Sequence, residues 1–575
     1  MNCKIRNVVL ILIFSALSLW FWGVLSPSVL YFRESVLWFP LTWERVGYAL
    51  SYPGGIADYV AEFIEQLFRF RLVAAIAVTA VLLVIRTLVL KISRKLGGEG
   101  MVVALSFIPA FIVWAFLCIF EYRFTAAVSL MLALSILLLL LTLTEGKNAK
   151  SLKFNILAAS VAGWYICGPV ALIIPAAMLL SWKKEHLGAV YSLLAVLLLP
   201  FLASFVLDYP ESQLYLGTDY HIVPGQVPSM LYLSMLSVLL CTALSALPSR
   251  LPAGRKWLGI VSTVFLDIAV FAGGWMYMTS KCNPVNERIF RYDRLVGEED
   301  WDGILSVALN RRPRTYAELC AVDLALAEKG RLLEDIFVFQ GQTAEALFPD
   351  YNLGYIMSLS TDRALMSAGL LNAARHYAFE KYQSFPNYRT GTRYLRSLAE
   401  IDIARGDFGP AGKYLDALSE TLFYRGLAAE WRRELSAGKP IAESADTCLY
   451  NDSSIHDKAL MLRRLCDSGN AGSVARQYLI AMDLLTLDLP ALRADLKIAG
   501  IVGDAPAAVR QALAMAVELF GNLTEEENAM LTDADRQLYA EFRLMSASSD
   551  TSSLRSRFGN TYWYYCIGAY NAKTN

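Results

Sequence analysis

The sequence predicts an all-α protein, with a polytopic helical membrane domain over 1–280, a linker over 281–298 and a helical repeat domain over 299–575. Of its 575 residues, 56% are apolar and only 18% are charged, and the mean hydropathy is +0.41. Residues 1–280 hold 19 Lys and Arg against 13 Asp and Glu, and the remainder holds 33 against 39. Helical periodicity then runs through the second half with almost no strand pattern. These features exclude a single water-soluble enzyme and a nucleic-acid-binding chain, which needs a basic surface.

Apolar runs long enough to cross a bilayer of about 30 Å recur through the first half. They cover 8–25, 71–90, 101–120, 124–144, 188–207, 229–248 and 257–279. The first run lacks a small-x-small cleavage site, so it is interpreted as an uncleaved transmembrane helix rather than a signal peptide. The stretch 154–182 is too long for one upright helix. Gly168 and Pro169 at its centre favour a hairpin of two short helices over one kinked helix.

The distribution of basic residues decides between these topologies. With a cytoplasmic N-terminus and two crossings at 154–182, the cytoplasmic segments hold 14 basic and three acidic residues, and the outer segments before residue 280 hold five and nine. This bias follows the positive-inside rule. It predicts nine spans in a bacterial inner membrane, with a cytoplasmic N-terminus and an extracytoplasmic, periplasmic second half.

Residues 26–70 form a large outer loop that mixes Trp, Tyr and Phe with charged residues. From Gly55 to Phe70, apolar and polar residues occupy opposite faces at helical spacing. The apolar set is Ile56, Tyr59, Val60, Phe63, Ile64, Leu67 and Phe68, and the polar set is Asp58, Glu62, Glu65 and Arg69. This pattern predicts an amphipathic helix suited to lying in the membrane interface.

Acidic residues supply the candidate catalytic groups, although polar loops at a membrane surface are also common. Glu34, just after the first helix, is the leading candidate for a general base or metal ligand, and Asp58, Glu121 and Asp219 are weaker candidates. Asp267 lies near the middle of the last apolar run, where a carboxylate is either functional or a partnered packing residue.

Motifs for metals, cofactors and disulfides are sparse. The four histidines are not paired at ligand spacing, and the sequence has no CxxC and no credible phosphate-binding glycine motif. No cofactor is therefore assigned, and a divalent cation at the outer acids stays an option whose metal is unknown. An oxidising compartment permits disulfides in the second half, where Cys448 and Cys466 are the closest pair in sequence.

The second half alternates amphipathic segments of about 12–18 residues with turns such as those at Gly330 and Gly406. The first segment has one apolar face, formed by Trp301, Ile304, Leu305 and Ala308. The next segment has small residues, Ala317 and Ala321, at the positions expected to meet that face. This spacing resembles degenerate tetratricopeptide repeats over 300–545, with a generic helical domain as the alternative. The resemblance implies an α-solenoid whose concave surface binds a partner. The aromatic stretch 559–565 is expected to pack on this array or to touch the membrane interface.

The order of one helix, a large acidic first outer loop, further spans and an outer repeat domain resembles the C-type fold (GT-C) of membrane glycosyltransferases. Those enzymes take sugars from polyprenyl-phosphate carriers. The resemblance is carried by 31–34, Tyr-Phe-Arg-Glu, and by 52–59, Tyr-Pro-Gly-Gly-Ile-Ala-Asp-Tyr. It implies that an acid of the first outer loop is the base or a metal ligand, and Glu34 occupies that region. The loop lacks the Asp-x-Asp or Asp-Glu pair of that family. The chain also looks like membrane proteins of Bacteroidota with a tetratricopeptide tail and a Thr-Tyr-Trp-Tyr-like ending.

The leading hypothesis is a membrane glycosyltransferase that moves a sugar or glycan from a lipid carrier to an acceptor on the outer face. Glu34 would deprotonate the acceptor hydroxyl or hold a divalent cation, Arg33 and Arg123 would neutralise phosphate charge, and the repeats would position a protein or glycan acceptor. The alternative is a non-catalytic, membrane-anchored scaffold for envelope assembly, and a transporter has only Asp267 in its support. Convergence of the outer acids would favour the enzyme, and scattered acids would favour the scaffold.

Overall fold

The computed structural model describes residues 3–98, 100–144, 149–180, 186–246, 256–339, 341–384, 391–436, 457–547 and 551–574. Within these ranges the regular secondary structure is helical, and the extended pairs are two isolated β-bridges. The all-α prediction is confirmed for this part of the chain.

The chain divides into two compact units. The first comprises Met1–Glu287 with two short later segments, 386–392 and 420–425, and the second comprises Arg288–Phe385, Arg393–Ser419 and Gly426–Asn575. The segment 281–298, which was predicted as a linker, contains helix α15 (Pro284–Gly297), and the boundary between the two units falls within it, after Glu287. Tyr292, Leu295 and Val296 of α15 recur at helical spacing and are buried in the core of the second unit.

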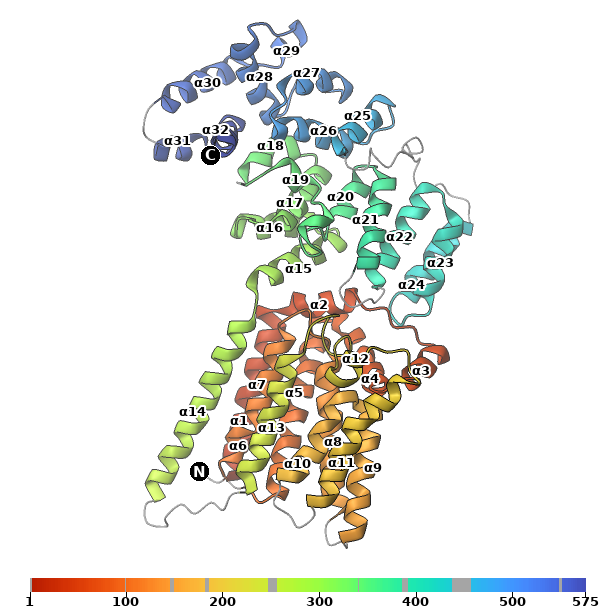
Figure 1. Ribbon diagram of the computed structural model, residues 1–575. Helices are drawn as coiled ribbons and strands as arrows, with labels where there is room; N and C mark the ends of the chain where they lie inside the picture. Colours follow the sequence, from red (N-terminus) through yellow and green to blue (C-terminus); the bar gives the residue numbers. More distant parts are fainter. Residues whose placement is uncertain are drawn as a thin grey trace. The chain divides into compact units, whose positions relative to one another are not determined.

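The first unit is a bundle in which the longer apolar helices lie side by side (Figure 1). These helices are α1 (Cys3–Trp20), α5 (Arg71–Lys95), α7 (Phe107–Leu117), α8 (Thr125–Leu143), α9 (Ala149–Cys167), α10 (Ile173–Leu180), α11 (His186–Ser204), α13 (Ser229–Ala246) and α14 (Lys256–Lys281). Shorter helical elements connect them, namely η1 (Phe21–Leu25), α2 (Pro27–Ser35), α3 (Trp43–Leu50), α4 (Gly55–Glu65), η2 (Gln66–Arg69), α6 (Val102–Leu105), η3 (Gly168–Leu172) and α12 (Glu211–Leu216).

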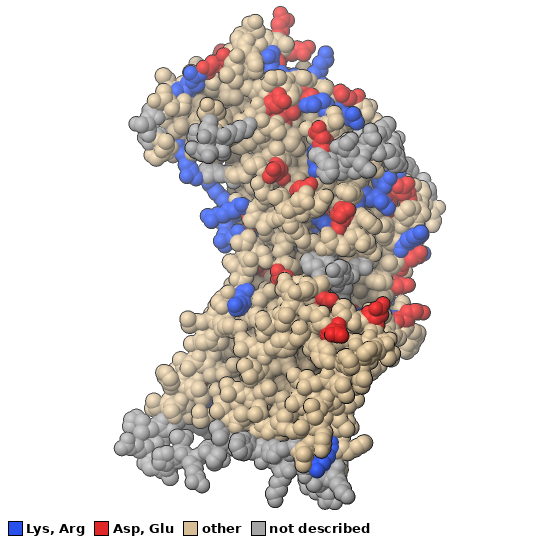
Figure 2. Space-filling view, in the orientation of Figure 1, with Lys and Arg blue, Asp and Glu red and all other residues tan. Residues whose placement is uncertain are grey.

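Among the described residues, six helical stretches are long and apolar enough to cross a membrane. They are Lys4–Leu25, Arg71–Lys95, Thr125–Leu143, Ser151–Leu180, Leu187–Ser204 and Val261–Lys281, and two shorter apolar stretches are Val102–Leu117 and Ser229–Ser245. The space-filling view shows few charged side chains over the bundle and many over the second unit (Figure 2). The charge asymmetry of the sequence thus corresponds to two different surfaces.

The stretch 151–180 is folded back on itself. Gly168 has φ +61°, a left-handed conformation that glycine adopts without strain, and 3₁₀ element η3 follows it. A Cβ placed on Gly163 would lie 2.7 Å from Ile174 Cδ1. A continuous helix would separate these two residues by about 16 Å along its axis. Helices α9 and α10 are therefore the two arms of a hairpin.

Aromatic packing fixes the first helix of the bundle against α7. The ring of Phe14, which is fully buried, lies 5.3 Å from Phe107, 5.1 Å from Phe111 and 5.4 Å from Trp114. Edge-to-face and tilted pairs of this kind are worth about 0.5–1.5 kcal/mol each beyond their buried area. Within the described bundle, this cluster lies at the core between α1 and α7.

The second unit consists of short helices connected by turns (Figure 1). They are α15, α16 (Trp301–Asn310), α17 (Tyr316–Glu328), α18 (Leu332–Asp335), η4 (Ile336–Val338), α19 (Ala344–Leu347), η5 (Tyr351–Leu353), α20 (Thr361–Ser367), α21 (Leu371–Ser384), α22 (Thr392–Arg405), α23 (Phe408–Ser419), α24 (Arg425–Ser436), α25 (Lys458–Asp467), α26 (Ser473–Thr486), α27 (Leu489–Ile498), α28 (Ala507–Phe520), α29 (Glu525–Ala529), α30 (Asp533–Ser546), α31 (Thr551–Phe558) and α32 (Tyr562–Thr574).

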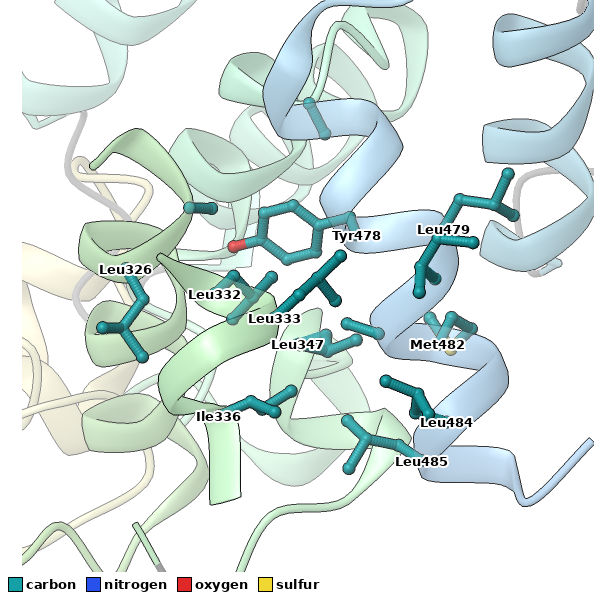
Figure 3. Close-up of a cluster of buried hydrophobic side chains, with 14 of the residues drawn as sticks. Leu326, Leu332, Leu333, Ile336, Leu347, Tyr478, Leu479, Met482, Leu484 and Leu485 are labelled. Atoms are coloured by element: carbon teal, nitrogen blue, oxygen red, sulfur yellow. The ribbon is translucent and has the colours of Figure 1, made fainter. Parts of the chain in front are cut away.

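Local sequence signals set the ends of many of these helices. At the start of α17, Thr315 and Glu318 form a reciprocal capping box that satisfies two backbone N–H groups. Gly330 and Gly406 end α17 and α22 with φ of +70° and +80°, as the expected turns require. Leucines of α17, α18, α19 and α26 then pack around Tyr478 in one buried cluster (Figure 3).

The aromatic stretch near the C-terminus packs on the helices of the second unit. Tyr562 and Trp563 are buried, and Trp563 Nε1 donates to the Gln511 carbonyl at 2.6 Å. The Tyr565 hydroxyl donates to the Leu485 carbonyl at 2.7 Å. Of the two expectations for this stretch, packing on the array is the one observed.

Candidate functional site

Helix α4 packs with its acidic face inward. Asp58 and Glu62 are only 1% and 2% exposed, whereas Phe63 on the opposite face is 47% exposed. The predicted amphipathic helix is therefore present, and its acidic face is the buried one. Buried carboxylates require charged or hydrogen-bonding partners, and these partners come from other loops of the first unit.

Asp58 has partners on both carboxylate oxygens. Its Oδ1 accepts from Arg123 Nη2 at 2.6 Å and from Thr125 Oγ1 at 2.7 Å, and its Oδ2 accepts from the Tyr52 hydroxyl at 2.8 Å. Gly54, with φ +86°, precedes α4 and approaches Gly168 so closely that a Cβ would lie 3.4 Å from the Gly168 nitrogen. This close approach fixes the start of α4 against the α9–α10 hairpin.

Two further acids of α4 extend the charged cluster. Glu62 bonds Arg45, and its Oε1 lies 3.7 Å from Arg123 Nη2. Burial raises the pKa of Glu65 to about 7, against the opposing effect of the Arg33 and Arg123 charges. The charged side chains of this cluster therefore come from α3, from α4 and from the residues just before α8.

The loop over 208–228 closes onto the same cluster through Arg123. An isolated β-bridge pairs Tyr122 with Ile222, and the Arg123 N–H donates to the His221 carbonyl at 2.9 Å. Arg123 Nη1 also donates to the Asp219 carbonyl at 2.5 Å. Asp219 reaches this position with φ +64°, which is uncommon outside glycine.

Several buried polar atoms in this loop have no hydrogen-bond partner among the described residues. They are Asp219 Oδ1, the Tyr220 hydroxyl and both ring nitrogens of His221. Burial and the nearby Arg123 charge lower the pKa of His221 to about 3, so its imidazole is neutral at physiological pH. Sequence reasoning had selected Asp219 but not Tyr220 or His221, whose environment depends on the bridge to Tyr122.

Arg33 is buried next to the Asp58 cluster, but the bonding partners of its guanidinium are backbone carbonyls. Its guanidinium donates to the carbonyls of Tyr122, of Leu117 at 3.0 Å and of Ile119 at 2.8 Å. These carbonyls follow the end of α7, where helix carbonyls need partners. Burial lowers the pKa of Arg33 and raises that of the neighbouring Glu121. Arg33 thus caps α7, and Glu121 enters the site through its backbone bond from Val223 N–H at 3.2 Å.

Glu34 belongs to a different environment in the first unit. It is 3% exposed, and its carboxylate oxygens lie 3.2 and 3.4 Å from the Tyr424 hydroxyl, which donates to them. The Arg69 guanidinium lies 4.8 Å from the centre of the Tyr424 ring. Burial raises the pKa of Glu34 to about 7, although the Arg69 charge and the Tyr424 hydrogen bond oppose this shift.

Tyr424 is held at Glu34 by the short segments of the first unit that come late in the sequence. Leu41 N–H donates to the Glu420 carbonyl at 2.8 Å, and a β-bridge pairs Pro40 with Thr421. Thr392 N–H donates to the Leu37 carbonyl at 3.3 Å. No sequence signal marks Tyr424, because its pairing with Glu34 spans 390 residues; Arg69 was visible only as the last charge of an amphipathic segment.

The predicted acids therefore converge in part. Asp58 and Asp219 meet at Arg123, and Glu121 is joined to them through backbone bonds, whereas Glu34 has its own partners. Asp267 is elsewhere in the first unit and accepts from Arg6. This pairing fits the packing interpretation of Asp267.

Two further predictions concerned a divalent cation and a disulfide. Within it, no group of three or more His, Cys, Asp or Glu is arranged to hold a metal ion. Cys448 lies outside the described residues, so its pairing with Cys466 stays a prediction; Cys466 is buried and forms no disulfide with a described cysteine.

Comparison with known proteins places the chain in a family. A family model described as a family of unknown function (DUF6057) matches residues 1–569. The chain belongs to this family. The match includes both compact units, so the family pattern covers the bundle and the helices that follow it. No curated protein and no solved structure matches the chain.

Proposed function

We propose that the chain is a membrane glycosyltransferase that moves a sugar or glycan from a polyprenyl-phosphate carrier to an acceptor on the outer face of a bacterial inner membrane. The observation that carries the proposal is Glu34, a buried carboxylate with a pKa near 7 that accepts from Tyr424 beside the Arg69 guanidinium. A general base works best when its pKa lies near the operating pH.

In the proposed reaction, an acceptor hydroxyl attacks the anomeric carbon of the carrier-linked sugar. The carbon–oxygen bond to the carrier phosphate breaks, the phosphate leaves with the bonding electrons, and Glu34 takes the hydroxyl proton. Tyr424 holds the carboxylate in place through its hydroxyl. Arg69, which is exposed, takes the phosphate-neutralising role that Arg33 and Arg123 were expected to share, because a guanidinium matches phosphate geometry.

The Asp58 cluster has a positioning role in this proposal. Arg123 is bonded to Asp58 and to the Asp219 carbonyl, and Arg33 is bonded to backbone carbonyls. These bonds fix α4, α7 and the 208–228 loop at one end of the bundle. Glu34 lies on α2, which packs against η2, and η2 in turn contacts α4; the last residue of η2 is Arg69.

Two parts of the proposal concern the setting of this site. The six long apolar stretches, of which 151–180 is a hairpin that would cross twice, and the two shorter stretches would together give nine crossings. With the excess of basic residues on alternate loops, they support a membrane domain with a cytoplasmic N-terminus and a periplasmic second unit. Helices α16 and α17 pack together, and their Ile304 and Ala321 belong to the same buried core, which supports a tetratricopeptide-like array that receives a protein or glycan acceptor.

The test compares lipid-linked glycans and envelope glycoproteins, by mass spectrometry, in a deletion strain that carries the parent gene, Glu34→Gln or Glu44→Gln. Glu44 is an exposed acid of the same loop and is the matched control. We expect a carrier-linked sugar to accumulate with Glu34→Gln and not with Glu44→Gln. Equal membrane levels of the variants, checked by immunoblot, exclude a folding defect. Unchanged glycans in the deletion strain would overturn the proposal.

One observation favours the scaffold alternative. Asp58, the most buried acid of the first outer loop, already has partners on both oxygens, which is the pattern of a structural ion pair. Under that alternative the bundle anchors the second unit, and the helical array binds an envelope partner. Crosslinking of the second unit in a strain with unchanged glycans would identify that partner.

A further inference from the structure

The second unit contains a cavity of about 690 Å³. Its wall is formed by the segment between η4 and α19, by the end of α26 and by α31 and α32. Small-molecule sites in proteins typically measure about 300–1,000 Å³ and are lined mainly by apolar and aromatic side chains with a few polar groups. The size of this cavity falls within that range, and all of its lining residues belong to the second unit, whereas Glu34 and Asp58 belong to the first.

The body of the cavity is apolar and aromatic. Phe337, Phe339, Leu485 and Tyr565 line it, and the rings of Phe337 and Tyr565 lie 5.2 Å apart. Leu485 is at the end of α26, at one margin of the leucine cluster (Figure 3). The Tyr565 hydroxyl is fixed on the Leu485 carbonyl at 2.7 Å, so the aromatic wall is anchored before any ligand arrives.

Buried polar groups interrupt this wall. Gln342 is 3% exposed, and its Nε2 donates to Asp323 at 2.7 Å, while its Oε1 has no hydrogen-bond partner among the described residues. The neighbouring Thr343 Oγ1 is buried without a partner there as well. Buried polar atoms that lack a hydrogen bond destabilise the folded protein. A ligand with an N–H group would supply the missing hydrogen bond.

Arg555 is the charged residue among the described residues that line the cavity, and it is exposed. We propose that this cavity binds a small organic anion with an aromatic body and an N–H donor. The aromatic body would pack on Phe337 and Phe339, the N–H would face Gln342, and the anionic group would face Arg555. Charge-assisted hydrogen bonds to a guanidinium are stronger than neutral ones, so the anion should contribute strongly to affinity.

The chain offers a variant that fills the cavity and a matched control. Gly568 lies on α32 at the cavity wall, and a Cβ placed there would meet no heavy atom within 4 Å. Gly412 lies on α23, away from the cavity, and its Cβ position is equally open. Gly568→Phe and Gly412→Phe therefore add the same side chain to a helix, and only the first occupies the proposed site.

The test titrates the full chain in lipid nanodiscs with dansyl-phenylalanine, which has aromatic rings, a sulfonamide N–H and a carboxylate, and follows dansyl fluorescence against empty nanodiscs. We expect saturable binding that Gly568→Phe weakens by about tenfold or more and Gly412→Phe leaves unchanged. Binding of equal strength in Gly568→Phe, or no saturable binding by the parent, would overturn the proposal.

A second ligand tests the assigned charge. Dansyl-phenylalaninamide keeps the rings and the N–H but lacks the carboxylate, so the parent should bind it about tenfold more weakly than the acid. In Arg555→Gln the acid and the amide should bind equally. If the preference for the acid persisted in Arg555→Gln, the proposed position of the anion would be wrong.

Discussion

The guanidinium of Arg6 forms two hydrogen bonds with the carboxylate of Asp267, 2.7 Å from Nε to Oδ2 and 2.6 Å from Nη2 to Oδ1. The pair joins α1, the first helix of the bundle, to α14, its last apolar helix. Arg6 also donates to the Gly100 carbonyl at 2.8 Å. Both side chains are largely buried, at 7% and 12% exposure, so the charges are partnered where solvent contributes little.

Removing one member of this pair should destabilise the first unit. We expect Arg6→Met to lower the free energy of unfolding by about 3 kcal/mol, because it leaves the Asp267 carboxylate buried without its cation. The double variant Arg6→Met/Asp267→Asn should recover part of that loss. Thermal unfolding of the purified full chain measures both, with the exposed Lys91→Met as control. Strictly additive losses would mean that the two side chains are not coupled.

The stability of the chain should depend on pH through Glu34. Its folded-state pKa of about 7 is raised above the usual 4.5, so its contribution to stability is fully present below pH 4.5 and is lost as pH rises through about 7. Glu34→Gln cannot ionise and should be more stable than the parent at about pH 8, by at most about 3 kcal/mol. Near pH 4, below the unfolded-state pKa, the two should be alike.

Chemical denaturation at several pH values measures this dependence. Glu44→Gln, which removes an exposed carboxylate, should retain the pH slope of the parent. Glu65 also has a pKa raised to about 7, so part of the slope should persist in Glu34→Gln and should decrease further in the double variant with Glu65→Gln. Identical slopes in the parent and Glu34→Gln would contradict the assigned pKa.

Arg123 should be the most sensitive residue of the Asp58 cluster. It bonds Asp58 at 2.6 Å and lies 3.7 Å from Glu62, so Arg123→Met leaves buried acids without this cation. We expect a loss of about 3–5 kcal/mol in the free energy of unfolding. Combining it with Asp58→Asn should reduce that loss, and the exposed Arg94→Met should have little effect. A fully stable Arg123→Met protein would exclude the positioning role.

Two glycine-to-alanine substitutions in the second unit should change the free energy of unfolding in opposite directions. Gly330 has φ +70° at the end of α17, where a Cβ is strained, so Gly330→Ala should cost about 1 kcal/mol. Gly412 is inside α23 with open space around its Cβ position, so Gly412→Ala should stabilise by about 0.5–1 kcal/mol. Equilibrium unfolding followed by circular dichroism compares the two variants with the parent.

Local features could be predicted because they depend on residues close in sequence. Apolar runs of bilayer length gave the positions of the long helices, and Gly168-Pro169 favoured the hairpin that the contact between Gly163 and Ile174 shows. The turns at Gly330 and Gly406 were also expected, since a left-handed residue at the end of a helix is commonly glycine. The exception is α15, whose apolar spacing was present in the sequence but was treated as a linker.

Tertiary structure decided the environments of the charged residues. The amphipathic pattern of α4 could not show that Asp58 faces Arg123, because a helix with one apolar and one charged face can bury either face if partners exist elsewhere. Burial raises the pKa of Glu34 against the opposing effects of Arg69 and Tyr424, and its hydrogen-bond partner lies 390 residues away in sequence. The sequence alone therefore determined the helices and their polarity, while the long-range packing of loops decided which acids are paired and which one can accept a proton.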